Sequence, residues 1–551
     1  MDEPTLDPIN TEDFEAAAAP SRPADLAGSS STRALATAGL IVTAASLASR
    51  ILGFARYIAI GRVVPDTASL DAFNTAFRLP DFLFQLVAAG ALASALVPVL
   101  AALFATGETQ RAWRVVATIT TLILSALFVL VVLAELATQE VVGFIAPGFT
   151  GAQLQTTVGL TRVMLLSPLF MAGGAIASAA LNARGRFAAA SAAPLVYNLG
   201  IIAGALFLVP AMGLTGLAVG VVVGAAGHLL VQVPGMIRIG ARVRPSLDLR
   251  DAPTRRALVL MGPRTLGLGA TQIVFLVMTA LATSLPTGSV TAFNLAFALL
   301  QIPIGVIGVP LGTVLLPSLS REAATGDAAA FRRLLVRGLG LLGYVMLAIT
   351  ALGIPVAGDV VREAYGPGHY SPEVMGWAAV TLSVFMLGLT AHSLIAVLAR
   401  AFYALQDTAT PVVAGIIAVA ANIVLGLALA GPLGLVGLAV AIAVGAWLET
   451  GILVVFLGRR MSGLGLGEVG LVLARSAVAA LPGALVSWGV MTVLLSAWGT
   501  EAGYLVTFVR LCLATAAGGV VIVGASLVLR IGEPRRILEI VLDLMRRRGR
   551  G

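Results

Sequence analysis

Long apolar runs alternate with short polar segments along almost the whole chain. Fourteen of these runs reach the roughly 20 residues that a helix needs to cross a bilayer. They cover residues 37–62, 72–104, 114–136, 155–181, 188–210, 214–237, 257–284, 289–318, 336–357, 375–399, 410–430, 433–457, 468–496 and 503–530. The pattern predicts an all-α polytopic membrane protein with fourteen transmembrane helices.

Polar segments divide the chain at both ends and once in the middle. Residues 1–34 are polar and acidic and lack the apolar core of a signal peptide, which indicates a disordered cytoplasmic tail. The basic end, 532–551, carries apolar residues at helical spacing, so it is either a helix on the inner leaflet or a solvated tail. The predicted units between the tails are an N-lobe (35–240, spans 1–6), a cytoplasmic linker (241–256), a C-lobe (257–460, spans 7–12) and spans 13–14 (461–531).

Arginines follow the same alternation. The loops after even-numbered spans are rich in arginine, whereas those after odd-numbered spans hold only Arg62 and Arg362, near span ends. This is the positive-inside pattern, and it predicts that both termini lie in the cytoplasm. The composition agrees, with 58% hydrophobic and 11% charged residues. A net charge of +8 therefore indicates topology and not nucleic-acid binding.

The two lobes repeat one sequence. The octapeptide 72–79 recurs at 292–299 with six of eight residues identical, and 213–219 matches 434–440. The separation between matched segments stays nearly constant, so spans 1–6 and 7–12 are two copies of a six-helix unit. Six spans are an even number, so the copies share one orientation and are parallel repeats about an axis along the membrane normal. Such a duplication favours an alternating-access transporter, although a static scaffold could also be duplicated.

Charged residues inside the apolar runs are the candidate substrate-binding residues. Arg50 would lie roughly 20 Å along its helix, where a charge costs about 2.5–3.5 kcal/mol unless it faces a wet cavity. Arg56 and Arg78 add positive charge to the N-lobe, and Asp71 lies two helical turns before Arg78, so the two can share a face. A cationic wall favours an anionic ligand. The alternatives are a buried structural ion network for Arg50, Arg56 and Asp71, or an arginine that snorkels to the headgroups.

Enzymatic chemistry has no counterpart in the sequence. The chain lacks a P-loop, a GxSxG motif and zinc-type Cys/His spacing, and its single cysteine, Cys512, excludes an internal disulfide. Glycine-rich runs such as 213–224 lie inside spans, where they indicate close helix packing. We therefore expect no enzyme activity, no cofactor and no metal site.

Several segments resemble one family in order along the chain. SRILGFAR (49–56), AFRLPDFL (76–83), GALASALVPVL (90–100), LGTVLLPSLSREAATGD (311–327) and FYALQDTATP (402–411) are similar to the MurJ/MviN lipid II flippases. The resemblance implies the fold of the MOP exporter superfamily, shared with MATE exporters, and a cavity between two lobes. It also implies that Arg50, Arg56, Asp71 and Arg78 correspond to charged positions of the family. The chain departs from the family at Phe84, Ala89 and Ala298, where relatives carry charged residues.

The resulting hypothesis is a flippase in the bacterial cytoplasmic membrane that moves undecaprenyl-diphosphate-linked peptidoglycan precursor by alternating access. Its expected partners are this anionic lipid, membrane lipids and cell-wall synthesis proteins, with no nucleic acid. The alternatives are a carrier for another lipid-linked polysaccharide, a MATE-like antiporter, or a non-transporting scaffold for cell-wall synthesis.

Overall fold

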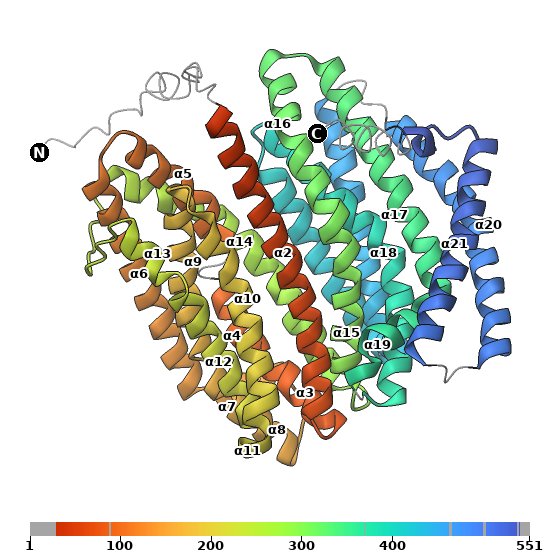
Figure 1. Cartoon of the computed structure of the whole chain (residues 1–551), viewed down its shortest axis with the longest axis horizontal. Coiled ribbons are helices and arrows are strands. Elements are labelled where there is room, and N and C mark those ends of the chain that lie inside the picture. Colours follow the sequence, from red (N-terminus) through yellow and green to blue (C-terminus); the bar gives the residue numbers. More distant parts are fainter. Residues whose placement is uncertain are drawn as a thin grey trace, which may run out of the picture.

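The computed structural model describes residues 29–86, 90–368, 370–461, 466–499, 503–536 and 539. Every regular element among these residues is a helix, which confirms the predicted all-α class. Figure 1 shows two helical bundles side by side, the N-lobe in red to yellow and the C-lobe in green to cyan, with the last two helices in blue along the outer edge of the C-lobe.

The helix bounds follow the chain through the two lobes. The N-lobe contains α2 (Ser29–Val63), α3 (Thr67–Ala76), α4 (Arg78–Phe84), α5 (Gly90–Ala105), α6 (Thr109–Leu136), α7 (Thr138–Ile145), α8 (Gly151–Met164), α9 (Ser167–Ala183), α10 (Phe187–Ala203), the π-helical turn η2 (Gly204–Leu208), α11 (Val209–Met212), α12 (Leu214–Leu230) and α13 (Val233–Arg238). The C-lobe contains α14 (Ala252–Thr283), α15 (Ser289–Pro303), the π-helical turn η3 (Ile304–Gly308), α16 (Val309–Thr325), α17 (Ala328–Tyr365), the 3₁₀ turn η4 (Gly366–Gly368), α18 (Pro372–Ala404) and α19 (Ala409–Arg460). The edge pair is α20 (Leu466–Trp498) and α21 (Tyr504–Val528).

Ten helical segments within the described residues are long and apolar enough to cross a membrane. One of them, α19, has 52 residues and contains two of the predicted spans, which meet at the non-helical backbone of Gly434. Three other predicted spans are broken by turns: 72–104 becomes α3, α4 and α5, 155–181 becomes α8 and α9, and 214–237 becomes α12 and α13. Both α9 and α13 have a proline in their first turn. The number fourteen therefore remains a prediction.

The backbone repeats as the sequence does. Gly213 (φ 60°, ψ −149°) and Gly434 (φ 57°, ψ −135°) adopt the same unusual conformation at equivalent positions, and both have the positive φ that glycine permits. A Cβ at Gly437 would overlap the backbone of Leu429, just as one at Gly216 would overlap that of Leu208. Residues eight apart in a straight helix are about 12 Å apart, so the chain doubles back at both glycines.

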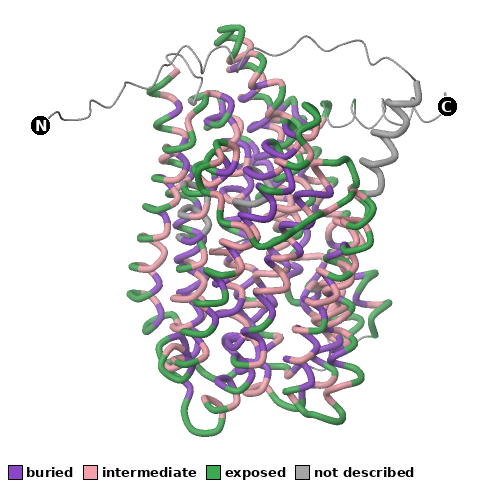
Figure 2. Tube along the Cα trace, turned by 90° about the vertical axis from the view of Figure 1, so that its left-hand side faces the viewer, coloured by how far each residue is buried: buried purple, intermediate pink, exposed green. Residues whose placement is uncertain are grey.

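Burial follows what a bilayer requires. Figure 2 shows buried residues along the inside of the bundles and exposed residues on the outer faces and at the two ends. Many exposed side chains of the outer helices are large and apolar, including Phe128, Leu133, Leu485 and Trp488. Because a water-facing surface rarely carries such contiguous apolar area, these faces suit lipid contact.

The lobes are joined along a central seam. Helix α14 packs against α5 of the N-lobe and α19 of its own lobe, and α2 packs against α10 and η4. A core cluster runs through the C-lobe and includes Ile60, Phe73 and Val158 of the N-lobe. The edge pair is attached by a buried ion pair in which the Arg510 guanidinium lies 3.0 Å from the Asp359 carboxylate of α17.

Most of the two predicted tails falls outside the residues that the structure describes. Helix α2 begins at Ser29, ahead of the predicted start of the N-lobe at 35. Residues 1–28, and residues 537, 538 and 540–551 of the predicted basic tail, fall outside the described residues. The same holds for 87–89 within the second predicted span.

Candidate functional site

A polar cavity of ≈ 160 Å³ lies at the seam between the lobes. Helices α2, α3, α4 and α10 of the N-lobe and α15 of the C-lobe contribute to its walls. Its polar lining consists of Arg56, Tyr57, Asn74, Arg78, Asp81 and Asn294, and aromatic and aliphatic side chains complete it. Two of the four predicted site residues, Arg56 and Arg78, therefore meet in one space.

Both arginines of this seam cavity keep unused hydrogen-bonding capacity. Within the described part of the chain, neither forms an ion pair. Arg78 donates from its terminal nitrogen to the Asn294 side-chain oxygen, and its guanidinium lies 5.6 Å from the centre of the Phe275 ring. The buried Nε of Arg78 has no acceptor among the described residues. The lining holds two cations and a single carboxylate, Asp81, so the cavity wall carries net positive charge.

Asp71 is absent from this lining and connects the lobes instead. Its buried carboxylate accepts hydrogen bonds from the backbone N–H groups of Gly288 (2.6 Å) and Thr291 (2.8 Å) and from the Thr291 hydroxyl (2.6 Å). These donors form the N-terminus of α15, where the helix dipole favours an anion. The N-cap of α15 is Gly288, which has no side-chain acceptor, so Asp71 of the other lobe caps the helix. In this conformation Asp71 therefore contacts the opposite lobe and not Arg78, and its role as a substrate-binding charge stays a prediction.

Arg50 also crosses the seam and also lies outside the cavity. It donates to the Gly305 carbonyl of η3 at 3.3 Å. A Cβ at position 305 would overlap the guanidinium of Arg50, so glycine lets the arginine rest on the backbone. In this conformation Arg50 is therefore a lobe-to-lobe contact, separate from Arg56 and Arg78.

Further contacts join the lobes at the end of the seam where Asp71 lies. The sequence did not predict them. Arg62 donates to the Pro367 carbonyl (2.7 Å), and the Tyr370 hydroxyl donates to the Tyr57 carbonyl (2.7 Å). Asn74 donates to the Thr291 hydroxyl (3.2 Å). All of these residues lie at or near the loops that follow odd-numbered predicted spans, so the lobes are held together at that end.

The sequence repeat itself indicates which residues of the two lobes face each other at the seam. In the register that aligns 72–79 with 292–299, Asp71 is equivalent to Thr291, and Asn74 is equivalent to Asn294. Two copies related by a two-fold axis bring equivalent positions face to face near that axis. The contacts of Asp71 and Asn74 with Thr291 place α3 and α15 beside that axis, and the contact of Arg78 with Asn294 places the start of α4 there.

Comparison with known proteins decides the family. The family model described as "Lipid II flippase MurJ" matches residues 62–509, most of the chain. The chain belongs to this family. It is 31% identical over 440 residues to the probable lipid II flippase MurJ of Vibrio cholerae, covering 77% of this chain and 82% of the relative. It is 32% identical over 434 residues to the lipid II flippase MurJ of Burkholderia cenocepacia, covering 77% and 84%.

Solved structures agree on the fold. The chain is similar to a lipid II flippase MurJ in an inward closed conformation, with a TM-score of 0.73 and 18% identity over 89% of this chain and 99% of that one. It is also similar to an inward-facing multidrug resistance MATE transporter of the MOP superfamily, with a TM-score of 0.61 and 14% identity over 76% and 95%. Together with the apolar helices, family membership makes this a multi-pass membrane protein of a transporter family.

Proposed function

We propose that this protein moves lipid II, the undecaprenyl-diphosphate-linked peptidoglycan precursor, from the inner to the outer leaflet of the cytoplasmic membrane by alternating access. Membership of the lipid II flippase MurJ family supports the substrate. The single observation that carries the mechanism is the positive cavity at the seam, in which Arg56 and Arg78 converge with no ion pair within the described residues.

The seam cavity offers what a diphosphate needs. Guanidinium groups bind phosphate oxygens through charge-assisted hydrogen bonds, which are about twice as strong as neutral ones. Asn294 holds one nitrogen of Arg78, which fixes the plane of the guanidinium and leaves other donors available. The Asn74 amide lines the same space. The lipid tail would remain in the bilayer while the headgroup passes between the lobes.

Release requires that the affinity of the site for the substrate differ between conformations. A ligand that binds both conformations equally well does not shift the equilibrium between them. In this conformation Asp71 ties α3 to α15 and closes one end of the seam. We assign Asp71 as the latch of that end, which faces outward if the arginine-rich loops and both termini are cytoplasmic. Opening the latch would separate Arg78 from Asn294 and weaken the site as the cavity turns outward.

Arg50 has a separate role in this scheme. Its partner is a neutral carbonyl, which is a weaker acceptor than a phosphate. A diphosphate that enters along the seam would therefore replace Gly305 as the acceptor for Arg50. In this way Arg50 would receive the headgroup before it reaches Arg56 and Arg78.

Three other functions fit some of these observations. The fold is shared with multidrug MATE transporters, but a net positive cavity disfavours cationic drugs. A carrier of another lipid-linked sugar would use the same arginine chemistry and differ in headgroup contacts. A cell-wall scaffold would not need the cavity charges at all.

The test replaces the endogenous flippase of a bacterial host with this protein under depletion and measures lipid II at the outer surface. Arg56→Ala with Arg78→Ala should abolish export, whereas Arg78→Lys should impair it partially, because lysine keeps the charge but loses the planar fork. Arg162→Ala is the matched control, since its ion pair with Glu135 is exposed and contributes little. Wild-type export by a normally expressed double variant would refute the site and favour the scaffold.

A further inference from the structure

A second cavity lies at the arginine-rich end of the N-lobe, away from the seam. It measures ≈ 790 Å³ and is bounded by the first turns of α6 and by residues 241–246, the start of the extended strap between α13 and α14. We call it the strap pocket. Its polar lining is Gln110, Trp113, Arg114, Arg242, Arg244 and Ser246.

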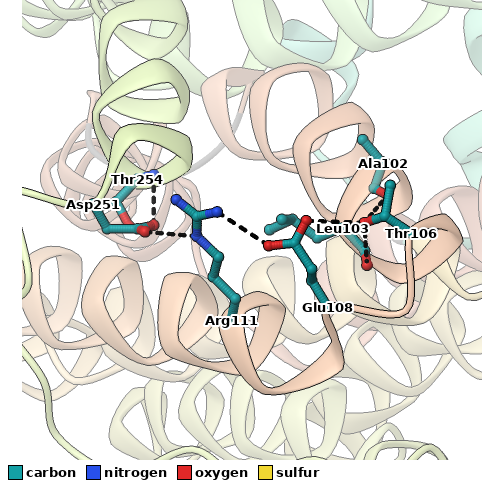
Figure 3. Close-up of polar contacts among 7 residues, drawn as sticks. All are labelled: Ala102, Leu103, Thr106, Glu108, Arg111, Asp251 and Thr254. Atoms are coloured by element: carbon teal, nitrogen blue, oxygen red, sulfur yellow. Dashed lines mark hydrogen bonds and ion pairs between the residues drawn. The ribbon is translucent and has the colours of Figure 1, made fainter.

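The strap is fixed on α6 at two points. Ser246 accepts at its hydroxyl from Thr118 (3.2 Å), and its backbone N–H donates to the Thr121 hydroxyl (3.1 Å). Farther along, Asp251 accepts from Arg111 at 2.8 Å. Figure 3 shows Arg111 lying between the carboxylates of Glu108 and Asp251. The strap pocket therefore has a defined wall.

The positive charge of the strap pocket has no acidic partner among the described residues. Arg114, Arg242 and Arg244 form no ion pair in the part of the chain that the structure describes, and no acidic side chain lines the pocket. Of the acids in and beside the strap, Glu108 and Asp251 bind Arg111, and Asp248 neither lines the pocket nor forms an ion pair among the described residues. The Trp113 side chain is only 5% exposed, and its buried indole Nε1 has no hydrogen-bond acceptor within the described ranges. The pocket thus presents donors and positive charge to whatever enters it.

The duplicated half of the molecule provides an internal comparison. A pocket of ≈ 410 Å³ lies against α17 in the C-lobe. In the register that aligns 105–108 with 324–327, its Ala329, Arg332, Arg333 and Val336 are the equivalents of Gln110, Trp113, Arg114 and Ala117. This copy also contains two acids, and both are paired: Glu468 binds Arg332 (2.9 Å) and Glu533 binds Arg536 (3.3 Å). One copy therefore supplies its own anions, whereas the strap pocket does not.

The position of the strap identifies the source of the anion. The strap follows a helical segment, Leu214–Arg238, that is long and apolar enough to cross the membrane. Beside its arginines it exposes Val243, Leu247 and Leu249. Basic and apolar side chains together suit the headgroup layer, where acidic lipids attract arginine. Binding of a free phosphate would leave these apolar residues unexplained.

We propose that the strap pocket binds the phosphate of an acidic phospholipid headgroup, distinct from the seam cavity. The guanidinium groups of the three strap-pocket arginines, together with the Trp113 indole N–H, would donate to the phosphodiester oxygens. The apolar strap residues would lie among the upper acyl carbons. This binding needs no lipid II and no transport.

The experiment uses the full-length protein, purified in a neutral detergent and titrated by calorimetry with short-chain phosphatidylglycerol. Short-chain phosphatidylcholine has the same chains and phosphodiester but no net charge, so it reports binding that does not depend on an acidic headgroup. Inorganic phosphate reports binding of the free anion. Each arginine near an acidic surface contributes about five-fold in affinity, so removal of all three should weaken phosphatidylglycerol binding roughly 100-fold. The variant is Arg114→Gln, Arg242→Gln and Arg244→Gln.

Two further variants make the result specific. A charge-matched control changes three arginines at the same end of the C-lobe, Arg321→Gln, Arg333→Gln and Arg337→Gln, and should leave the affinity within about two-fold. Trp113→Phe keeps an aromatic ring and removes the N–H donor, so it should weaken binding about five-fold. Equal losses in both triple variants, or equal binding of phosphatidylcholine, would overturn the proposal. Inorganic phosphate that binds as tightly as phosphatidylglycerol would overturn its lipid source.

Discussion

Replacing Asp71 by asparagine should open the end of the seam that Asp71 closes. The asparagine side chain keeps the shape of aspartate but loses its charge. Its NH₂ group would face a donor where an acceptor is needed, either the N–H of Gly288 or the N–H and hydroxyl of Thr291. Hydrogen bonds to a charged group contribute about 1.5–3 kcal/mol each, and an anion at a helix N-terminus up to about 2 kcal/mol. Because the charged side chain is desolvated in the closed state, we expect a net loss of about 3 kcal/mol.

This loss acts on the balance between conformations, because the contact joins the two lobes. Carrying a two-state equilibrium from 1:99 to 99:1 takes about 5.5 kcal/mol, so about 3 kcal/mol would raise an open state from about 1% to roughly 60%. Asp66→Asn is the matched control. Asp66 caps α3 within the N-lobe through Ser69 and makes no lobe-to-lobe contact among the described residues.

The assay is a distance distribution from paired spin labels on Gln139→Cys and Glu373→Cys, both exposed and on opposite lobes, in a Cys512→Ser background. Asp71→Asn should add a longer-distance population that wild type and Asp66→Asn lack. If Asp71→Asn folds and gives the wild-type distribution, the latch is elsewhere and our energetic reasoning is wrong.

Three other outcomes are expected. Gly148→Ala should open the same end, because a Cβ there would overlap the Thr283 backbone of the other lobe, whereas Gly143→Ala meets open space and should leave the spin-label distances unchanged. A cysteine at Leu249 should resist an impermeant maleimide in intact cells while one at Ser371 reacts, and labelling of the first would contradict the proposed orientation. Burial alone would raise the pKa of Asp251, but the hydrogen bonds it accepts lower it overall. Its contribution to holding the strap is therefore present above about pH 4 and lost as the pH falls through the depressed value, and faster amide exchange along the strap there would report the loss.

Local pattern predicted much of the fold. Apolar runs located the helices, and the matched sequences at Gly213 and Gly434 predicted that the two halves share a design, which their common backbone conformation bears out. The runs could not separate helix breaks from continuous helices, because an apolar turn at Phe77 and a proline at Pro168 leave the hydrophobic pattern intact. The hydrophobic pattern therefore predicted the positions of the helices more accurately than their number.

The sequence could group charges that belong to one lobe, but it could not indicate contacts across the seam. Arg56 and Arg78 lie on neighbouring helices of the N-lobe, and charge inside apolar runs was enough to group them. The partners of Asp71 and Arg50 lie in the other half of the sequence and include backbone groups, which have no sequence signature. Only the two-fold relation between the repeats could have placed Asp71 opposite Thr291.

That pairing also says something about how such a molecule can arise. A symmetric homodimer of six-helix chains would carry the same residue on both sides of its axis, so an aspartate at this position would face another aspartate. Two buried carboxylates in contact repel each other, and one would have to take up a proton. An aspartate opposite a threonine requires two copies that mutate independently. The closure at Asp71 is thus available to a chain whose two halves differ in sequence and not to a symmetric dimer of identical halves.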